Sequence, residues 1–141
     1  MCSRSIVAGE EAVKSIKDAS DIGNIEVVEL NLESLQSIRK CADAILGKYD
    51  CIDILVNNAG IMALPKLEYT ENNFEKQIGV NHFGHFYFTS LLIPSMIAHG
   101  NPSRVVNIAS TAHNFGSVDT NDLHYKKGRQ YKPWEAYGTN K

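Results

Sequence analysis

The chain has 141 residues, of which 43% are hydrophobic and 21% are charged, the composition of an ordinary globular protein with one domain. The formal net charge is -2 and the two signs are interspersed, which excludes a nucleic-acid surface and a polybasic membrane surface. The longest apolar run, Phe86 to Ala98, is shorter than the roughly 20 residues of a membrane-spanning helix.

The first part of the chain alternates helix patterns with strand patterns. Residues 7–19 predict a helix with Val13 and Ile16 on its inward face, and residues 25–30 predict a short strand. Residues 33–48 predict a second helix, because their apolar side chains recur at helical spacing. These side chains are Leu35, Ile38, Ala42, Ile45 and Leu46.

The same alternation continues to the end of the chain. Residues 52–56 and 104–109 predict two more strands, and Thr70 predicts the N-cap of a long helix from Glu71 towards Ala98, with Pro94 at a kink or near its end. This order predicts an α/β fold with a parallel sheet and helices on both faces. Met1–Arg4 resembles the tail of a strand with nothing before it, and Lys141 falls where a helix is starting, so we expect a piece truncated at both ends.

A tyrosine and a lysine near the end of the chain have a spacing that suits acid/base chemistry. Tyr137 and Lys141 are four positions apart, so they share one face of a helix. A nearby ammonium group favours the phenolate and lowers a tyrosine pKa that is normally near 10. The spacing alone also fits a pair with a purely structural role.

Polar residues follow two of the predicted strands, at the sheet edge where α/β folds hold ligands. Asn57-Asn58-Ala59-Gly60 follows residues 52–56, and Gly60 would let the backbone approach a ligand closely. Ser110 follows residues 104–109 and could donate a hydrogen bond to a substrate carbonyl. The plainer interpretations are a turn for the tetrapeptide and a helix cap for Ser110.

Six segments in this order resemble the short-chain dehydrogenase/reductase family, and within it the retinol dehydrogenase group. They are Arg4 and residues 30–34, 53–60, 80–86, 110–113 and 137–141. The resemblance covers nearly the whole chain and implies a partial Rossmann-type doubly wound parallel sheet, without the first strand, its glycine-rich loop and the C-terminal strands. We therefore interpret residues 1–141 as one incomplete NAD(P)-binding domain.

The resemblance implies hydride transfer between a nicotinamide and a lipophilic alcohol, aldehyde or ketone, assisted by four catalytic residues. Tyr137 would exchange the proton of the substrate oxygen and Ser110 would polarise that oxygen. Lys141 would lower the tyrosine pKa and hold the nicotinamide ribose. Asn81 would bind, through its backbone, a water that continues the proton relay, although an asparagine can also be merely tolerated in a helix. His82 and His85 are expected to be packing or surface residues, and no metal is expected.

Cofactor choice depends on Arg4, which falls where the family reads the adenosine ribose. An arginine there can pair with a 2′-phosphate, so the resemblance favours NADP over NAD. Asn31 and Leu32 replace the family's usual Asp-Leu pair beside adenine, and an asparagine can still accept a hydrogen bond from the adenine amine. The remaining cofactor-binding residues would be Asn58, Ala59, Gly60, Tyr137 and Lys141.

The sequence lacks the Thr-Gly-x-x-x-Gly-x-Gly segment that the family uses for the pyrophosphate. We therefore expect this piece alone to bind cofactor poorly and to be inactive, and a non-catalytic scaffold is the alternative function. The resemblance leaves open a homodimer of the full-length protein, and a cytoplasmic or cytoplasm-facing location with membrane attachment through a missing N-terminus.

Two remaining sets of side chains carry weaker expectations. The aromatic and apolar residues between Ser110 and Tyr137 could line a substrate pocket or simply pack together. They are Phe115, Val118, Leu123, Tyr125, Tyr131 and Trp134. Cys2, Cys41 and Cys51 match no zinc or redox spacing, so we expect a reducing compartment and three small, buried or half-buried apolar residues.

Overall fold

The structure is a computed structural model that describes the chain except residues 22, 99 and 141. The first sheet and its helices are β1 (Cys2–Ser3), α1 (Ile6–Ala19), β2 (Val28–Glu29) and α2 (Leu35–Leu46). The second sheet and its helices are β3 (Ile54–Asn57), α3 (Lys76–Ile78), the π-helix η1 (Gly79–Gly84), α4 (His85–Ala98) and β4 (Arg104–Asn107). The 3₁₀ helix η2 (Thr111–Phe115) and α5 (Pro133–Thr139) complete the chain.

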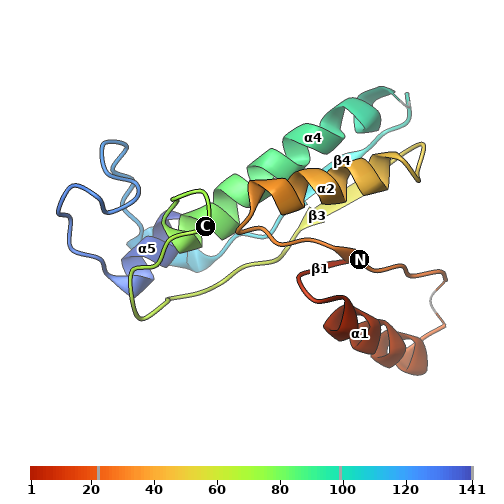
Figure 1. The fold of residues 1–141 in the computed structure, drawn as a ribbon, viewed down its shortest axis with the longest axis horizontal. Coiled ribbons are helices and arrows are strands. Elements are labelled where there is room, and N and C mark those ends of the chain that lie inside the picture. Colours follow the sequence, from red (N-terminus) through yellow and green to blue (C-terminus); the bar gives the residue numbers. More distant parts are fainter. Residues whose placement is uncertain (22, 99, 141) are drawn as a thin grey trace.

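Within the described residues the strands form two separate two-stranded parallel sheets, β1 with β2 and β3 with β4 (Figure 1). Successive side chains of a strand point to opposite faces. The Cys2 sulfur faces α2, where it lies 3.9 Å from the sulfur of Cys41. Ser3 faces α1, which lies so close that a Cβ added to Gly9 would be 3.2 Å from the Cβ of Ser3. Helices on both faces of the first sheet confirm the predicted α/β class with parallel strands.

The strands are shorter than the sequence pattern predicts. Residues 25–30 predict a strand, but the ladder covers only Val28–Glu29 because its partner β1 has two residues. Hydrogen bonds from the Val28 N–H to the Met1 carbonyl (3.0 Å) and from the Leu30 N–H to the Ser3 carbonyl (2.9 Å) flank this short pairing.

The prediction that Thr70 caps a helix from Glu71 is wrong. Residues 71–74 form a turn in which Asn73 has a φ of 62°, and the Thr70 hydroxyl accepts a hydrogen bond from the Phe74 N–H at 3.2 Å. The helix begins instead at α3, where the buried Glu75 carboxylate accepts hydrogen bonds from the N–H groups of Gln77 (3.0 Å) and Ile78 (2.9 Å). Thr70 therefore closes a turn, and Glu75 caps the helix.

The hydrophobic core lies between α2, β3, η1 and α4. Ser34 caps α2 through a hydrogen bond from the Ser37 N–H, and the apolar face of this helix packs against α4. The buried core residues are Leu32, Ile38, Cys41, Ala42, Leu55, Val80, Phe88, Leu92 and Met96. Pro94 lies inside α4 in its last turns, near the end at Ala98, which is one of the two positions that the sequence predicts for it.

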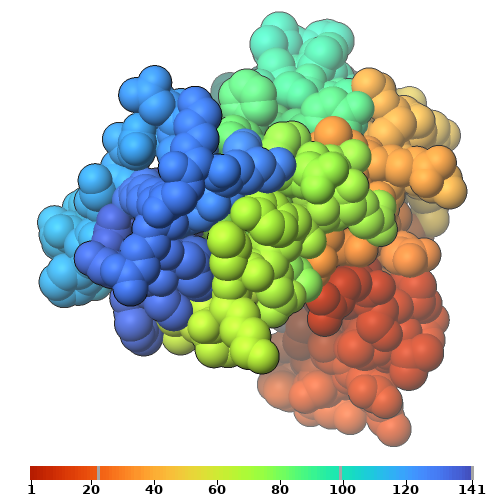
Figure 2. Space-filling model, turned by 60° about the vertical axis from the view of Figure 1, so that its left-hand side comes forward, coloured from red at the N-terminus to blue at the C-terminus, as the bar shows by residue number. Residues whose placement is uncertain are grey.

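Helix α1 lies at the edge of this arrangement. Gly9 is its only buried residue, while Val13 and Ile16 are half-buried rather than fully inward-facing. Figure 2 shows the N-terminal part in red, protruding on one side of the lime-green chain that follows β3, while the blue C-terminal loop lies on the other side. Of the helices described, none is long and apolar enough to span a bilayer.

Candidate active site

Six residues predicted to bind the cofactor line one cavity of about 740 Å³ between the two sheets. They are Arg4 after β1, Asn31 and Leu32 after β2, and Asn58, Ala59 and Gly60 after β3. These six residues follow the carboxyl ends of β1, β2 and β3, and the cavity also runs along β1 and β3 themselves, since Cys2, Ser3 and residues 54–57 line it too. The volume falls within the roughly 300–1,000 Å³ of small-molecule pockets.

Asn31 is held in a turn at the edge of this cavity. Its side-chain oxygen accepts a hydrogen bond from the Glu33 N–H at 3.1 Å, and its own N–H donates to the Ser37 hydroxyl at 2.9 Å. An amide oxygen has two lone pairs, so the Asn31 oxygen retains one for a ligand. The turn fixes the orientation of this side chain, which the sequence pattern alone does not predict.

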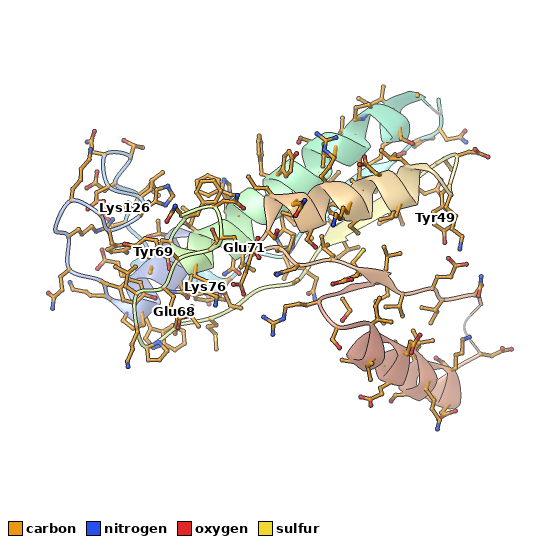
Figure 3. The ribbon with its side chains drawn as sticks, viewed as in Figure 1. Tyr49, Glu68, Tyr69, Glu71, Lys76 and Lys126 are labelled. Atoms are coloured by element: carbon orange, nitrogen blue, oxygen red, sulfur yellow. The ribbon has the colours of Figure 1, made fainter. Side chains whose placement is uncertain are left out.

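Charged groups of both signs surround the mouth of the cavity. Arg4 lies 3.5 Å from the Glu33 carboxylate, and its side chain remains 74% exposed. Lys76 lies 3.2 Å from Glu33 and 3.1 Å from Glu68, and these two carboxylates raise its pKa (Figure 3). Exposed ion pairs contribute little stability, so Arg4 is free to exchange Glu33 for an anionic ligand.

Asn81 connects three separate segments through its side chain. Its oxygen accepts a hydrogen bond from the Ile61 N–H at 2.9 Å, and its nitrogen donates to the Ile61 carbonyl at 2.8 Å and to the Asn140 side-chain oxygen at 2.7 Å. Its backbone carbonyl lies 3.0 Å from Nδ1 of the buried His85. Asn81 lies in the π-helix η1, and it therefore joins the chain after β3 to the end of α5.

A second cavity, of about 280 Å³, lies at the carboxyl end of β4 beside Asn81 and Asn140. Asn57 and Asn107 are paired across β3 and β4, and both line this cavity. The Asn57 amide donates hydrogen bonds to the Asn107 side-chain oxygen at 2.8 Å and to the Thr89 hydroxyl at 3.0 Å. No role was predicted for Asn107 or Asn140 from the sequence. Their positions could have marked them as candidates, because Asn107 ends a strand and Asn140 directly precedes the candidate Lys141.

Ser110 and Tyr137 lie on two elements that pack directly against each other. The Ser110 hydroxyl caps η2 by accepting a hydrogen bond from the Ala112 N–H at 3.2 Å, and it keeps its own hydrogen to donate. The contact between η2 and α5 requires a glycine after Tyr137, because a Cβ on Gly138 would lie 2.3 Å from the Ala112 carbonyl oxygen. Tyr137 is half-buried, and Lys141 lies outside the described residues.

The loop between Ser110 and Tyr137 divides into a packed part and an exposed part. Tyr125 and Tyr131 meet edge to face at 5.2 Å, and burial raises the pKa of Tyr131 to about 12. The Tyr131 hydroxyl donates a hydrogen bond to the Leu64 carbonyl at 3.1 Å. Phe115, Val118 and Trp134 are exposed and are the apolar side chains available to a lipophilic ligand.

Parallel strands with helices on both faces define an α/β protein of the Rossmann type. Residues 1–121 match the family model described as short chain dehydrogenase. The chain therefore belongs to the short-chain dehydrogenase/reductase family, a family of oxidoreductases, as its motifs indicated.

Individual relatives support the same family and its retinol dehydrogenase-like group. Retinol dehydrogenase 13 of Homo sapiens is 41% identical over 94% of this chain and 39% of its own length. Polyprenol dehydrogenase of Mus musculus is 40% identical over 94% of this chain and 40% of its own length. A crystal structure of a protein from Mycobacterium paratuberculosis is 40% identical, with a TM-score of 0.84 over all of this chain and 47% of that one. The chain thus spans about two fifths of the length of these curated relatives.

Proposed function

We propose that this chain carries the adenosine-binding and proton-transfer parts of an NADP(H)-dependent oxidoreductase that acts on a lipophilic alcohol, aldehyde or ketone. The observation that carries the proposal is the single cavity lined by Arg4, Asn31, Leu32, Asn58, Ala59 and Gly60. When bound, the nicotinamide supplies or accepts the hydride, and the protein binds, orients and exchanges the proton.

The cavity fits the adenosine end of the cofactor better than its centre. Arg4 offers a guanidinium to a 2′-phosphate, Asn31 offers an amide oxygen to the adenine, and Gly60 leaves the backbone after β3 open to close approach. The sequence has no glycine-rich pyrophosphate loop, so binding through this chain would depend on the adenosine half.

The proton-transfer part would consist of Tyr137 and Ser110, positioned by the packing of η2 on α5. Tyr137 would hold the proton exchanged with the substrate oxygen, and the free hydrogen of Ser110 would orient that oxygen. Lys141 would favour the phenolate of Tyr137, and Asn81 would hold in place Asn140, the residue directly before Lys141. The names of the retinol and polyprenol dehydrogenases, together with the exposed Phe115, Val118 and Trp134, support a lipophilic substrate.

A binding experiment that needs no pyrophosphate loop tests the cofactor half. We expect adenosine 2′,5′-bisphosphate to bind the chain about five- to tenfold more tightly than adenosine 5′-monophosphate in calorimetry at low salt, because only the former meets Arg4 with a 2′-phosphate. Arg4→Ala should remove this difference. Arg104→Ala is the matched control, because Arg104 is an exposed arginine of β4 that does not line the cavity. Equal affinities in the unmodified chain would contradict the proposed preference for NADP.

The alternative is a scaffold that keeps the fold without catalysis. Turnover separates the two. A full-length oxidoreductase that contains this chain should oxidise NADPH in the presence of a long-chain aldehyde, and Tyr137→Phe should slow this reaction about 10²-fold or more. Retained binding of adenosine 2′,5′-bisphosphate without any turnover would instead support the scaffold.

A further inference from the structure

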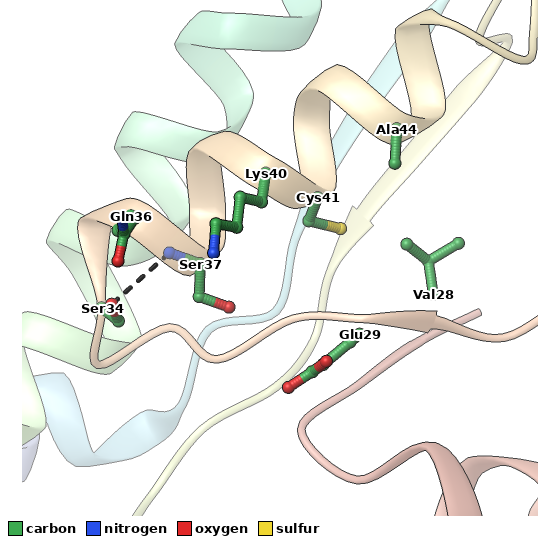
Figure 4. A pocket seen from close by; sticks show the side chains of 8 residues that line it. All are labelled: Val28, Glu29, Ser34, Gln36, Ser37, Lys40, Cys41 and Ala44. Carbon is green, nitrogen blue, oxygen red and sulfur yellow. Dashed lines mark hydrogen bonds between the residues drawn. The ribbon is translucent and has the colours of Figure 1, made fainter.

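Two of the three cysteines are in contact where α2 packs on the first sheet, which the sequence spacing did not predict. The sulfur atoms of Cys2, on β1, and Cys41, on α2, lie 3.9 Å apart although they are 39 positions apart in the chain. Cys2 is exposed, contrary to the expectation that all three cysteines are at least half-buried, whereas Cys41 is only 2% exposed. Figure 4 shows the Cys41 sulfur directed from α2 into a pocket beside Val28 of β2.

The two thiols differ in reactivity. The hydrogen bond from the Cys41 thiol lowers the pKa of Cys2 to about 7, while that same contact and burial raise the pKa of Cys41. The third cysteine, Cys51, has a raised pKa because of burial and the nearby Asp53 and Asp50 carboxylates. Cys2 is therefore an accessible thiolate with a buried thiol in contact, the arrangement of an attacking and a resolving cysteine.

We propose that Cys2 and Cys41 form a redox-modification site that reacts with small-molecule disulfides of the glutathione type. The Cys2 thiolate attacks one sulfur of oxidised glutathione, forms a mixed disulfide and releases one glutathione thiolate. The Cys41 thiol then loses its proton to solvent and attacks the Cys2 sulfur, which releases the second glutathione. The two cysteines are oxidised to one disulfide, and one oxidised glutathione is reduced to two thiols.

The fold permits the disulfide with a small movement. The sulfur atoms must approach from 3.9 Å to a bond length of about 2.05 Å, and β1 is a two-residue strand outside the main core. The bond would join β1 to α2, which is part of the main core. It would also close a long loop of the chain, so oxidation should stabilise the folded state.

The experiment exposes the folded chain to excess oxidised glutathione at pH 7 and follows its intact mass and peptide map. We expect the unmodified chain to lose two hydrogens and to yield a single linked pair, the peptides of Cys2 and Cys41. Cys41→Ser should stop at a stable glutathione adduct on Cys2, and Cys2→Ser should form no disulfide within the chain. Cys51→Ser, the matched control, should react as the unmodified chain does.

A second measurement compares alkylation rates in the folded chain. At pH 7 about half of Cys2 is thiolate, because its pKa is about 7. Burial and the Asp53 and Asp50 carboxylates raise the pKa of Cys51, so less of Cys51 is thiolate than of an ordinary cysteine. The lower intrinsic nucleophilicity of Cys2 offsets only part of this advantage. Cys2 should therefore react with iodoacetamide faster than Cys51, by roughly severalfold, and the difference should vanish in urea.

Three results would overturn the proposal: three intact thiols after oxidation, a disulfide that involves Cys51, or dimers linked between chains. Because Cys41→Ser places a hydroxyl in the core, Cys41→Ala is the second variant, and circular dichroism checks the fold of each. The melting temperature gives an independent readout. Oxidation should raise it in the unmodified chain and in Cys51→Ser, and leave it unchanged in Cys2→Ser.

Discussion

Asn81 shows how a residue marked by a motif can act through contacts that the motif does not contain. The motif predicts a role for the Asn81 backbone, whereas in the structure its side chain bonds to Ile61 and Asn140. Its partners lie 20 and 59 positions away, so no local pattern could predict them. Asn81 therefore positions the last residues of α5, next to the proposed Lys141.

A double-mutant cycle tests this connection. Asn81→Ala removes three hydrogen bonds from a buried site and should lower the free energy of unfolding in urea by about 2–3 kcal/mol. Asn140→Ala should lower the free energy of unfolding by less. The double variant should lose about 0.5 kcal/mol or more less than the sum of the two single losses, because the two residues share a hydrogen bond. Asn101→Ala, an exposed asparagine, is the control and should change stability by less than about 0.5 kcal/mol. Additive losses would show that the two amides act independently.

His124 provides a pH-sensitive contact in the loop before Tyr137. Its Nδ1 accepts a hydrogen bond from the Glu75 N–H at 3.2 Å, and its ring packs 5.5 Å from that of Phe74. Burial and the charge of Lys126 lower its pKa in the folded state. The unfolded chain then binds a proton more readily, so the stability contributed by neutral His124 is present above the unfolded pKa of about 6.5 and is lost as the pH falls through the folded pKa.

We expect the melting temperature to fall between pH values of about 7.5 and 5.5, and to fall less in His124→Asn, which retains an acceptor but cannot titrate. Burial raises the pKa of Glu75, so this carboxyl acts in the opposite direction as the pH falls. Because Glu75 is present in both proteins, the difference between them isolates His124. Parallel pH profiles would rule out a contribution of this histidine.

At the scale of elements, periodicity predicts what packs in a regular way. The helices α1 and α2 and the strands β3 and β4 were predicted within a few residues, because helical apolar spacing or a short apolar run marks each of them in the sequence. The start of the long helix was predicted wrongly, since Thr70 and Glu75 can both cap and only the turn with Asn73 decides between them. The π-helix η1 leaves no signature in the periodicity of so short a segment.

The candidate site likewise has residues that the sequence predicts and contacts that it does not. The residues proposed to bind the cofactor follow predicted strands and could be named from the sequence. The pairing of the Asn57 and Asn107 amides could not be predicted, since the bond between them spans 50 positions. The packing of η2 on α5 depends on two glycines, Gly116 and Gly138, whose close approach appears only in three dimensions.

Gly138→Ala tests whether this close approach positions Ser110 and Tyr137. The added Cβ would meet the Ala112 carbonyl oxygen at 2.3 Å and the Gly116 nitrogen at 2.7 Å, and backbone atoms cannot rotate away as a side chain can. We expect η2 to shift from α5, with a loss of about 1–3 kcal/mol in the free energy of unfolding and a changed fluorescence of the single tryptophan, Trp134. Gly23→Ala is the control, because its added Cβ would meet nothing within 4 Å. Unchanged stability in Gly138→Ala would contradict the proposed packing constraint.

At the scale of the whole molecule, burial is distributed unevenly. The core between α2, β3, η1 and α4 contains most of the buried hydrophobic side chains, whereas α1 buries only Gly9. On the second sheet, Ile54 and Val56 are 63% and 53% exposed, while Leu55 between them is buried, so one face of β3 is covered and the other is open to solvent. An open apolar face of this kind favours association with other apolar surfaces.

This distribution predicts that the molecule opens first at its N-terminal helix. In native-state hydrogen exchange, the amides of α1 should exchange at low denaturant, well before those of α4, because opening α1 exposes little apolar surface. Leu92→Ala removes a side chain that is 1% exposed and should lower the free energy of unfolding by about 2–5 kcal/mol. Val7→Ala removes one that is 66% exposed, and should cost less than about 0.5 kcal/mol. If α1 and α4 instead exchanged together, the first sheet would belong to the main cooperative unit. The contact of Cys2 with Cys41 joins this sheet to α2 in the core, so repeating the exchange on Cys2→Ser would show whether that contact carries the coupling.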